Sequence, residues 1–231
     1  MGAEPQIIYS DDWLIVINKP ALINSVSQIN GSNDSIAQWL TERYPGIDEA
    51  SEDPLDGGLV NRLDFETSGI LIAARSRPTW LALKEQYSKG EIDKTYLAII
   101  EGAPKLPLVI EAYIGNRYRG SKKVTVQSYP ENRFQHTHSI LRRMMSHDKS
   151  RNISIVEIEA MTGARHQIRA HCASVGHALV GDTLYGSSQT LDVEALPFAL
   201  HAAQVAFTHP QSMNEAKYVA SLPEYFVLAR L

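Results

Sequence analysis

An aspartate and an arginine stand two residues apart in the stretch VNRLDFETSGILIAA, residues 60–74. Arg62 and Asp64 are followed by Ser68 and Gly69, a pair typical of a turn, and then by an apolar run that predicts a buried strand. A carboxylate among apolar neighbours costs free energy unless it is paired or hydrogen-bonded. Asp64 is therefore expected at the rim of a sheet, where it either accepts hydrogen bonds from loop amides or carries out chemistry on a ligand.

A second group of charged residues lies in the stretch TGARHQIRAHCASVG, residues 162–176. Its apolar spacing predicts a helix that begins near Thr162 as N-cap. Arg165 and Arg169 stand four residues apart, so they are expected on one face of that helix. Cations near a helix N-terminus oppose the helix dipole, so this face is either a solvated surface with adventitious charges or a face that binds an anion. The anion is either a phosphate of a nucleic acid or a carboxylate of the chain itself, with Asp64 as a candidate.

The remaining candidates are open to a purely structural interpretation. Tyr96, in the predicted strand KTYLAIIEG, either packs in the core or lies at a site. The basic segments at residues 116–123 and 141–143 are either solvated surface or, with the arginines above, a track for a polyanion. The eight histidines match no ligand spacing, and phosphate-loop, dinucleotide-binding and GxSxG motifs are absent. Neither a metal nor a cofactor is predicted.

The composition predicts one cytoplasmic domain. The 231 residues are 44% hydrophobic, enough to bury a sizeable core, and the net charge is −4 with a pI of about 6.1. Cys172 is the single cysteine, which rules out an internal disulfide and suits a reducing compartment. No signal peptide and no run of eighteen apolar residues is present. We therefore expect a soluble cytoplasmic chain with a single domain over residues 1–231.

The pattern along the chain predicts an α+β fold. Residues 7–17 read as a hairpin, residues 35–44 and 78–90 as helices, and residues 153–160 as a strand. Strand pairs lie close together in the sequence, and helices occur between them irregularly. A largely antiparallel or mixed sheet is therefore favoured over a doubly wound parallel sheet.

Four segments occur in an order and spacing that resemble RluA-type pseudouridine synthases: NRLDFETSGILIAA, KTYLAIIEG, TGARHQIRAHCASVGHALVGDTLYG and LHAAQVAFTHP. The opening segment IIYSDDWLIVINKPA looks like that family's first hairpin, so the resemblance runs from about residue 7 to residue 210. It implies a central mixed, mainly antiparallel sheet flanked by helices and loops. It also implies a monomeric enzyme that isomerises uridine in structured ribosomal or transfer RNA without cofactor or metal, and that binds neither DNA nor membrane. The chain resembles the short members, which lack an extra N-terminal RNA-binding module.

The same resemblance implies a role for each candidate residue. Asp64 looks like the catalytic aspartate, and Arg62 like the residue that helps to extrude the target nucleotide. Tyr96 looks like the active-site tyrosine, and Arg169 like the ion-pair partner of the aspartate. Arg165 is expected to contribute a further positive charge to RNA binding.

Three positions depart from the family pattern. Leu22 stands where glycine often follows Lys-Pro-Ala, Asn61 where histidine usually precedes Arg-Leu-Asp, and Ala164 where arginine usually follows Thr-Gly. These departures leave open an alternative, a catalytically inactive RNA-binding relative of the same fold. A carboxylate-based glycoside hydrolase is a third reading, which requires a second acid such as Glu66.

Overall fold

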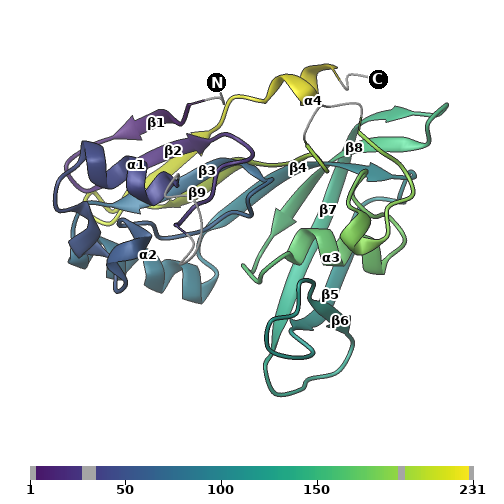
Figure 1. Ribbon diagram of the computed structural model, residues 1–231, viewed down its shortest axis with the longest axis horizontal. Helices are drawn as coiled ribbons and strands as arrows, with labels where there is room; N and C mark the ends of the chain where they lie inside the picture. The colour runs from purple at the N-terminus through teal and green to yellow at the C-terminus, as the bar shows by residue number, and fades with distance from the viewer. Residues whose placement is uncertain (1–3, 28–34, 192–195, 229–231) are drawn as a thin grey trace. The chain divides into compact units, whose positions relative to one another are not determined.

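The computed structural model describes residues 4–27, 35–191 and 196–228 and divides into two compact units (Figure 1). Unit 1 consists of residues 1–93 and 202–223, and unit 2 of residues 94–201 and 224–231. Each unit contains its own strands of the sheet and its own hydrophobic clusters. The single catalytic domain that the sequence predicts stays a prediction.

The sheet of unit 1 begins with the predicted hairpin. The strands follow one another across the sheet as β1, β2, β3 and β9, and β10 pairs with β9. Asp11 closes the hairpin turn, because its Oδ1 accepts hydrogen bonds from the backbone N–H groups of Trp13 and Leu14, each at 2.8 Å. The bounds are β1 Gln6–Ser10, β2 Leu14–Lys19, β3 Ser68–Ala74, β9 Leu200–Thr208 and β10 Glu215–Val219.

Helices α1 and α2 cover opposite faces of β2 and β3 in unit 1 (Figure 1). Ile36 and Leu40 of α1 (Ile36–Arg43) pack on the face that carries Ile15 and Leu71. Trp80 and Leu83 of α2 (Arg77–Lys89) pack on the opposite face, which carries Val16 and Ile72. Alternate residues of a strand point to opposite faces, so Leu14–Ile17 of β2 and Ile70–Ala74 of β3 are apolar without a break. Two 3-10 turns, Ile47–Ala50 and Pro54–Asp56, complete this unit.

The sheet of unit 2 places the first residues of β9 beside β4, followed by β8, β7, β5 and β6. Helix α3 packs on this sheet through Ile168 and Cys172, both of which are buried. The bounds are β4 Asp93–Glu101, β5 Leu108–Gly115, β6 Thr125–Gln127, β7 Phe134–Asp148, β8 Ile153–Ala160, α3 Gln167–Ser174, the 3-10 turn η3 Thr183–Tyr185 and α4 Glu224–Leu228.

Helix α3 begins four residues later than the sequence predicts. His166 has φ 55°, a left-handed conformation that precedes the first helical residue, Gln167. The Gln167 side chain reaches back, and its Oε1 accepts hydrogen bonds from the Thr162 hydroxyl (2.8 Å) and the Ala164 N–H (3.1 Å). Thr162 is therefore not the N-cap. The expected shared helical face of Arg165 with Arg169 is also wrong, because Arg165 lies before the helix.

Every strand pair whose register is described is antiparallel, and the α+β fold class is confirmed. Within the described residues, no helix has the length and apolar character needed to cross a membrane.

Candidate active site

Asp64 lies in an irregular turn between residues 61 and 67, directly before β3. The side chain is half-buried, whereas that of Arg62 is exposed. The Thr67 N–H donates to the Asp64 carbonyl at 3.1 Å and closes the turn. Ser25 holds the other end, because its hydroxyl donates to the Leu63 carbonyl (2.8 Å) and accepts from the Leu63 N–H (2.9 Å). Asp64 therefore sits in a turn whose backbone is fastened on both sides.

Lys19, the last residue of β2, supports the same turn from inside the protein. It is 0% exposed, and its ammonium donates to the carbonyls of Pro20 (3.0 Å), Ile23 (2.7 Å) and Phe65 (3.3 Å). Burial lowers the pKa of Lys19 to about 7, while the carboxylates of Asp64 and Glu66 act in the opposite direction. A buried cation near Asp64 favours the ionised form of that carboxylate.

The sequence analysis did not identify Lys19 as part of the site. Its signal was a lysine at the end of the strand LIVINK, whose first four residues, Leu14–Ile17, are apolar on both faces. A lysine at such a position has to find acceptors inside the protein, because an unpaired buried charge is costly.

The structure gives a local role to two of the positions that depart from the family pattern. The Asn61 side chain bonds to the backbone of β3, donating to the Ile70 carbonyl (3.2 Å) and accepting from the Ile72 N–H (2.9 Å). Leu22 has φ 65°, and its N–H donates to the Phe65 carbonyl at 2.8 Å. Glycine adopts this conformation without strain, which gives a steric reason for the glycine that the family pattern often has at this position. Both residues therefore maintain the Asp64 turn.

Arg169 is buried in unit 2 and forms a two-point ion pair with Asp182. Its Nε and Nη2 donate to the two carboxylate oxygens of Asp182 at 2.7 and 3.0 Å. The two side chains are 6% and 2% exposed. The guanidinium carbon lies 4.3 Å from the centre of the Phe198 ring and 5.2 Å from that of Tyr185. This geometry fixes the orientation of the guanidinium group.

Sequence reasoning missed Asp182. The pattern that pointed to it was the Gly-Asp pair directly before η3. A pairing of Arg169 with Asp64 joins residues of different units and stays a prediction.

The other predicted residues of unit 2 lie on separate elements. Tyr96 is half-buried on β4, where it pairs in register with Ile158 of β8 and packs against the core. Arg165 is exposed, and its Nη2 donates to the Asn116 side chain (2.8 Å) and to the Ser121 carbonyl (2.7 Å). The structure thus brings Arg165 to residues 116–121, which carry much of the basic charge identified in the sequence.

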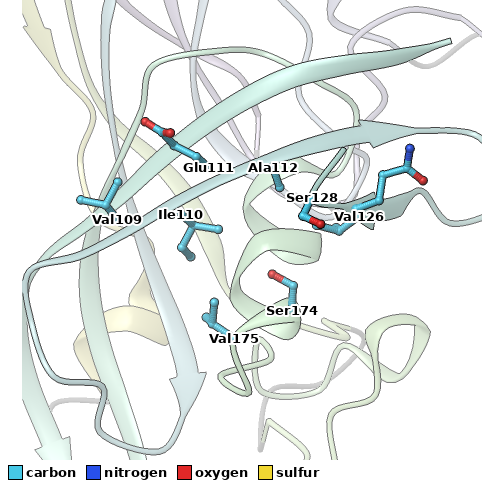
Figure 2. A pocket seen from close by; sticks show the side chains of 9 residues that line it. Val109, Ile110, Glu111, Ala112, Val126, Ser128, Ser174 and Val175 are labelled. Atoms are coloured by element: carbon cyan, nitrogen blue, oxygen red, sulfur yellow. The ribbon is translucent and has the colours of Figure 1, made fainter. Parts of the chain in front are cut away.

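An open groove of about 340 Å³ lies in unit 2, away from these residues. Figure 2 shows Ser174 and Val175, at the end of α3, facing the strands that carry residues 109–112 and 126–128. None of the five residues that the sequence predicts for the site lines this groove. We therefore assign no part of the predicted chemistry to it.

The family model for RNA pseudouridylate synthase matches residues 13–174. The chain belongs to the RNA pseudouridylate synthase family. The matched segment includes the Asp64 turn, β4 and α3. The predicted family and the predicted class of enzyme, an RNA pseudouridine synthase, are thus confirmed.

Curated relatives agree with this family. The chain is 30% identical over 95% of its length to ribosomal large subunit pseudouridine synthase D of Zymomonas mobilis, of which it covers 69%. It is 32% identical over 95% of its length to an uncharacterized RNA pseudouridine synthase of Bacillus subtilis, of which it covers 68%. It covers 58% of the synthase D of Neisseria meningitidis, to which it is 29% identical over 94% of its own length.

A solved structure shows the same fold. Human RNA pseudouridylate synthase domain containing 4 superposes with a TM-score of 0.73 at 23% identity, covering 96% of this chain and 90% of that one. At this identity the likeness establishes the architecture, and it confirms the predicted pseudouridine synthase fold.

Replacing Lys19 by methionine tests how this synthase holds its Asp64 turn. The folded-state pKa of about 7 lies below the ordinary lysine value of about 10.4, so between these values the unfolded chain binds more protons. The Lys19 contribution to the free energy of unfolding is therefore lowest at or below pH 7 and rises by up to about 1.4 kcal/mol per pH unit above it. Urea unfolding at pH 7, 8 and 9 should show wild type gaining stability relative to Lys19→Met.

The exposed lysine Lys149 provides the control for this titration. Lys149→Met should follow the wild-type pH dependence. A wild-type-minus-Lys19→Met difference that stays constant from pH 7 to 9 would show that Lys19 keeps its ordinary pKa in the folded protein.

Replacing Arg169 by methionine should destabilise the protein by about 3–5 kcal/mol, because it leaves the buried Asp182 carboxylate without a partner. The control is Arg142→Met, which breaks an exposed pair with Glu159 at 2.6 Å and should cost no more than about 1 kcal/mol. Urea unfolding at pH 7 measures both. Equal losses in the two variants would contradict a structural role for the buried pair.

Proposed function

We propose that this chain converts specific uridines in a structured RNA, ribosomal or transfer, to pseudouridine with Asp64 as the catalytic carboxylate. The observation that carries the proposal is the fastened turn, which presents a half-buried Asp64 beside an exposed Arg62. A catalytic side chain has to be held within a fraction of an ångström of its productive position. The bonds from Lys19 and Ser25 meet that requirement from the protein side.

The reaction breaks the bond between N1 of uracil and C1′ of the ribose, turns the base while it remains bound, and joins C5 to C1′. The proton on C5 is then lost, and N1 gains one, so the product is an isomer of the substrate. In this proposal Asp64 acts as nucleophile or as general base, and Lys19 supports its turn from inside the protein. Both roles require a carboxylate, which makes its removal the decisive test.

The other site residues act on the nucleotide rather than on its bonds. The target base has to leave the helix stack, which costs a few kcal/mol, and the exposed Arg62 side chain is long enough to fill the gap. Tyr96 is proposed to stack on the extruded base. Arg169, oriented by Asp182, is proposed to form an ion pair with Asp64 as well.

The proposal also covers the RNA substrate, the oligomeric state and the cellular location. The curated relatives named above from Zymomonas and Neisseria are described as acting on the ribosomal large subunit, which makes ribosomal RNA the first substrate to test. We propose a monomer that acts in the cytoplasm. The single cysteine, which allows no internal disulfide, suits a reducing compartment.

Replacing Asp64 by asparagine should lower turnover by at least ~100-fold while RNA affinity stays within a few-fold, because the carboxylate acts in the chemical steps. Glu66→Gln, two residues away on the same turn, is the matched control and should retain activity. RNA treated with each protein is digested to nucleosides, and pseudouridine is separated from uridine by liquid chromatography and identified by mass spectrometry.

The same assay separates the alternatives. Turnover in Asp64→Asn within tenfold of wild type would overturn the catalytic assignment. Wild-type protein that binds RNA but forms no pseudouridine would favour the inactive relative, and loss of activity in Glu66→Gln alone would move the catalytic role to that residue.

A further inference from the structure

A basic loop, defined here as residues 116–123, connects β5 to β6 in unit 2. Its sequence NRYRGSKK contains four cations and one aromatic residue, and no acidic residue occurs from residue 116 to residue 130. Arg117, Arg119, Lys122 and Lys123 are exposed, and Tyr118 is 67% exposed. An exposed aromatic ring between two arginines is a common arrangement for binding unpaired nucleotides.

Arg165 closes the base of this loop. Its Nη2 bridges the first residue of the loop, through the Asn116 side chain at 2.8 Å, and the Ser121 carbonyl at 2.7 Å. Within the loop, the Ser121 N–H donates to the Tyr118 carbonyl at 3.2 Å, and Gly120 has φ 86° at the third position of this turn. That conformation suits glycine. Residues 117–120 therefore protrude as a closed, shaped turn.

A second set of contacts fastens the end of the loop. The N–H of the buried Val124 donates to the Tyr185 hydroxyl oxygen at 2.9 Å, and that hydroxyl lies 3.0 Å from Nδ1 of His166. Burial, followed by the charges of Arg169 and Arg165, lowers the pKa of His166 to about 4, so its ring is neutral at neutral pH and shares one hydrogen bond with the Tyr185 hydroxyl. The chain from Val124 through Tyr185 to His166 thus joins the loop to the start of α3.

This arrangement concentrates positive charge at a cost in free energy. Arg165 adds a fifth cation to the four in the loop, and both of its bonds to the loop go to neutral oxygens. Like charges held close together repel one another, and a polyanion offsets that repulsion. A loop already fixed in shape also loses less conformational entropy when a ligand binds.

We propose that the basic loop is a preformed RNA-binding surface and that Arg165 is a positioning residue that closes it. Arg117 and Arg119 contact phosphates, Tyr118 stacks on an unpaired base, and Arg165 acts through the loop. This inference rests on the proposed function, because it assigns the surface to the RNA that the enzyme modifies. It also changes the role of Arg165 from the direct RNA contact expected from the sequence.

A double-mutant cycle tests the positioning role. The proteins are wild type, Arg165→Gln, the loop variant Arg117→Gln with Arg119→Gln, and the combined variant. The dissociation constant is measured at several salt concentrations with total ribosomal RNA and with total transfer RNA, and kcat and KM with whichever of them the wild type modifies. Lys149→Gln, which removes one exposed charge elsewhere in unit 2, is the control and should leave affinity within twofold.

The positioning role of Arg165 predicts a different result for each variant of the cycle. Arg165→Gln should weaken binding several-fold and raise KM with kcat unchanged. The loop variant should lower the slope of log affinity against log salt by about 1.4–1.8, for two phosphate contacts. When Arg165→Gln is added to the loop variant, the dissociation constant should change by less than twofold, because the effects of residues that act as a unit are not additive. If the fold-changes in dissociation constant of the two parent variants multiply in the combined variant, Arg165 contacts RNA itself and the positioning role is overturned.

Two single variants keep the test independent of any folding defect in Arg165→Gln. Asn116→Ala removes one acceptor of the closure without changing the charge, and it should weaken RNA binding as Arg165→Gln does. Arg165→Lys, which can still donate to both oxygens, should restore most of the affinity. Unchanged affinity in Asn116→Ala would overturn the closure model.

The binding face of the loop is tested by Tyr118→Ala. It should weaken binding about fivefold or more with no change in salt slope, because stacking contributes roughly 1–3 kcal/mol per base. Unchanged affinity in Tyr118→Ala would overturn the stacking contact. A wild type that forms no pseudouridine yet shows the predicted cycle in RNA binding would sink the proposed function while leaving the loop assignment in place.

Discussion

The Asp64 turn depends on a buried ammonium group. Lys19 ends a strand that is apolar on both faces, and desolvating its charge would destabilise the fold if it had no partners. Its three carbonyl acceptors come from the chain just after β2 and from Phe65, the residue after Asp64. The same group thus ties two segments that are far apart in sequence and places positive charge near the carboxylate. A turn with no regular hydrogen-bond pattern acquires a defined shape in this way.

Unit 2 contains one buried and one exposed arginine, and the two have different roles. Arg169 is buried, bonded at two points to Asp182 and stacked on Phe198, so its geometry is fixed by the protein. Arg165, four residues earlier, is exposed and reaches neutral oxygens of the basic loop. Buried cations need full compensation and therefore set geometry, whereas exposed cations keep most of their hydration and remain available to a polyanion. Proximity in the sequence consequently says little about their roles.

Local patterns were sufficient to predict most of the fold. The first hairpin, α1, α2 and β3 follow from apolar spacing and from Gly90 at the end of α2, both of which act over a few residues. The start of α3 was mispredicted because the Gln167 side chain and the left-handed His166 compete with the helix. Lys19 and Asp182 were missed because their partners are distant or are backbone atoms, which no residue pattern records.

Charge position, rather than net charge, governs how this chain meets RNA. A net charge of −4 predicts repulsion from a polyanion if it is spread evenly. At physiological salt, however, exposed charges separated by more than about 8 Å are largely screened from one another. Arg165 bridges Asn116 and Ser121, which keeps the cations of the basic loop together in a stretch that contains no acid. A phosphate approaching that loop therefore meets a stretch of chain with four cations and no acid, which the bonds of Arg165 hold in one shape.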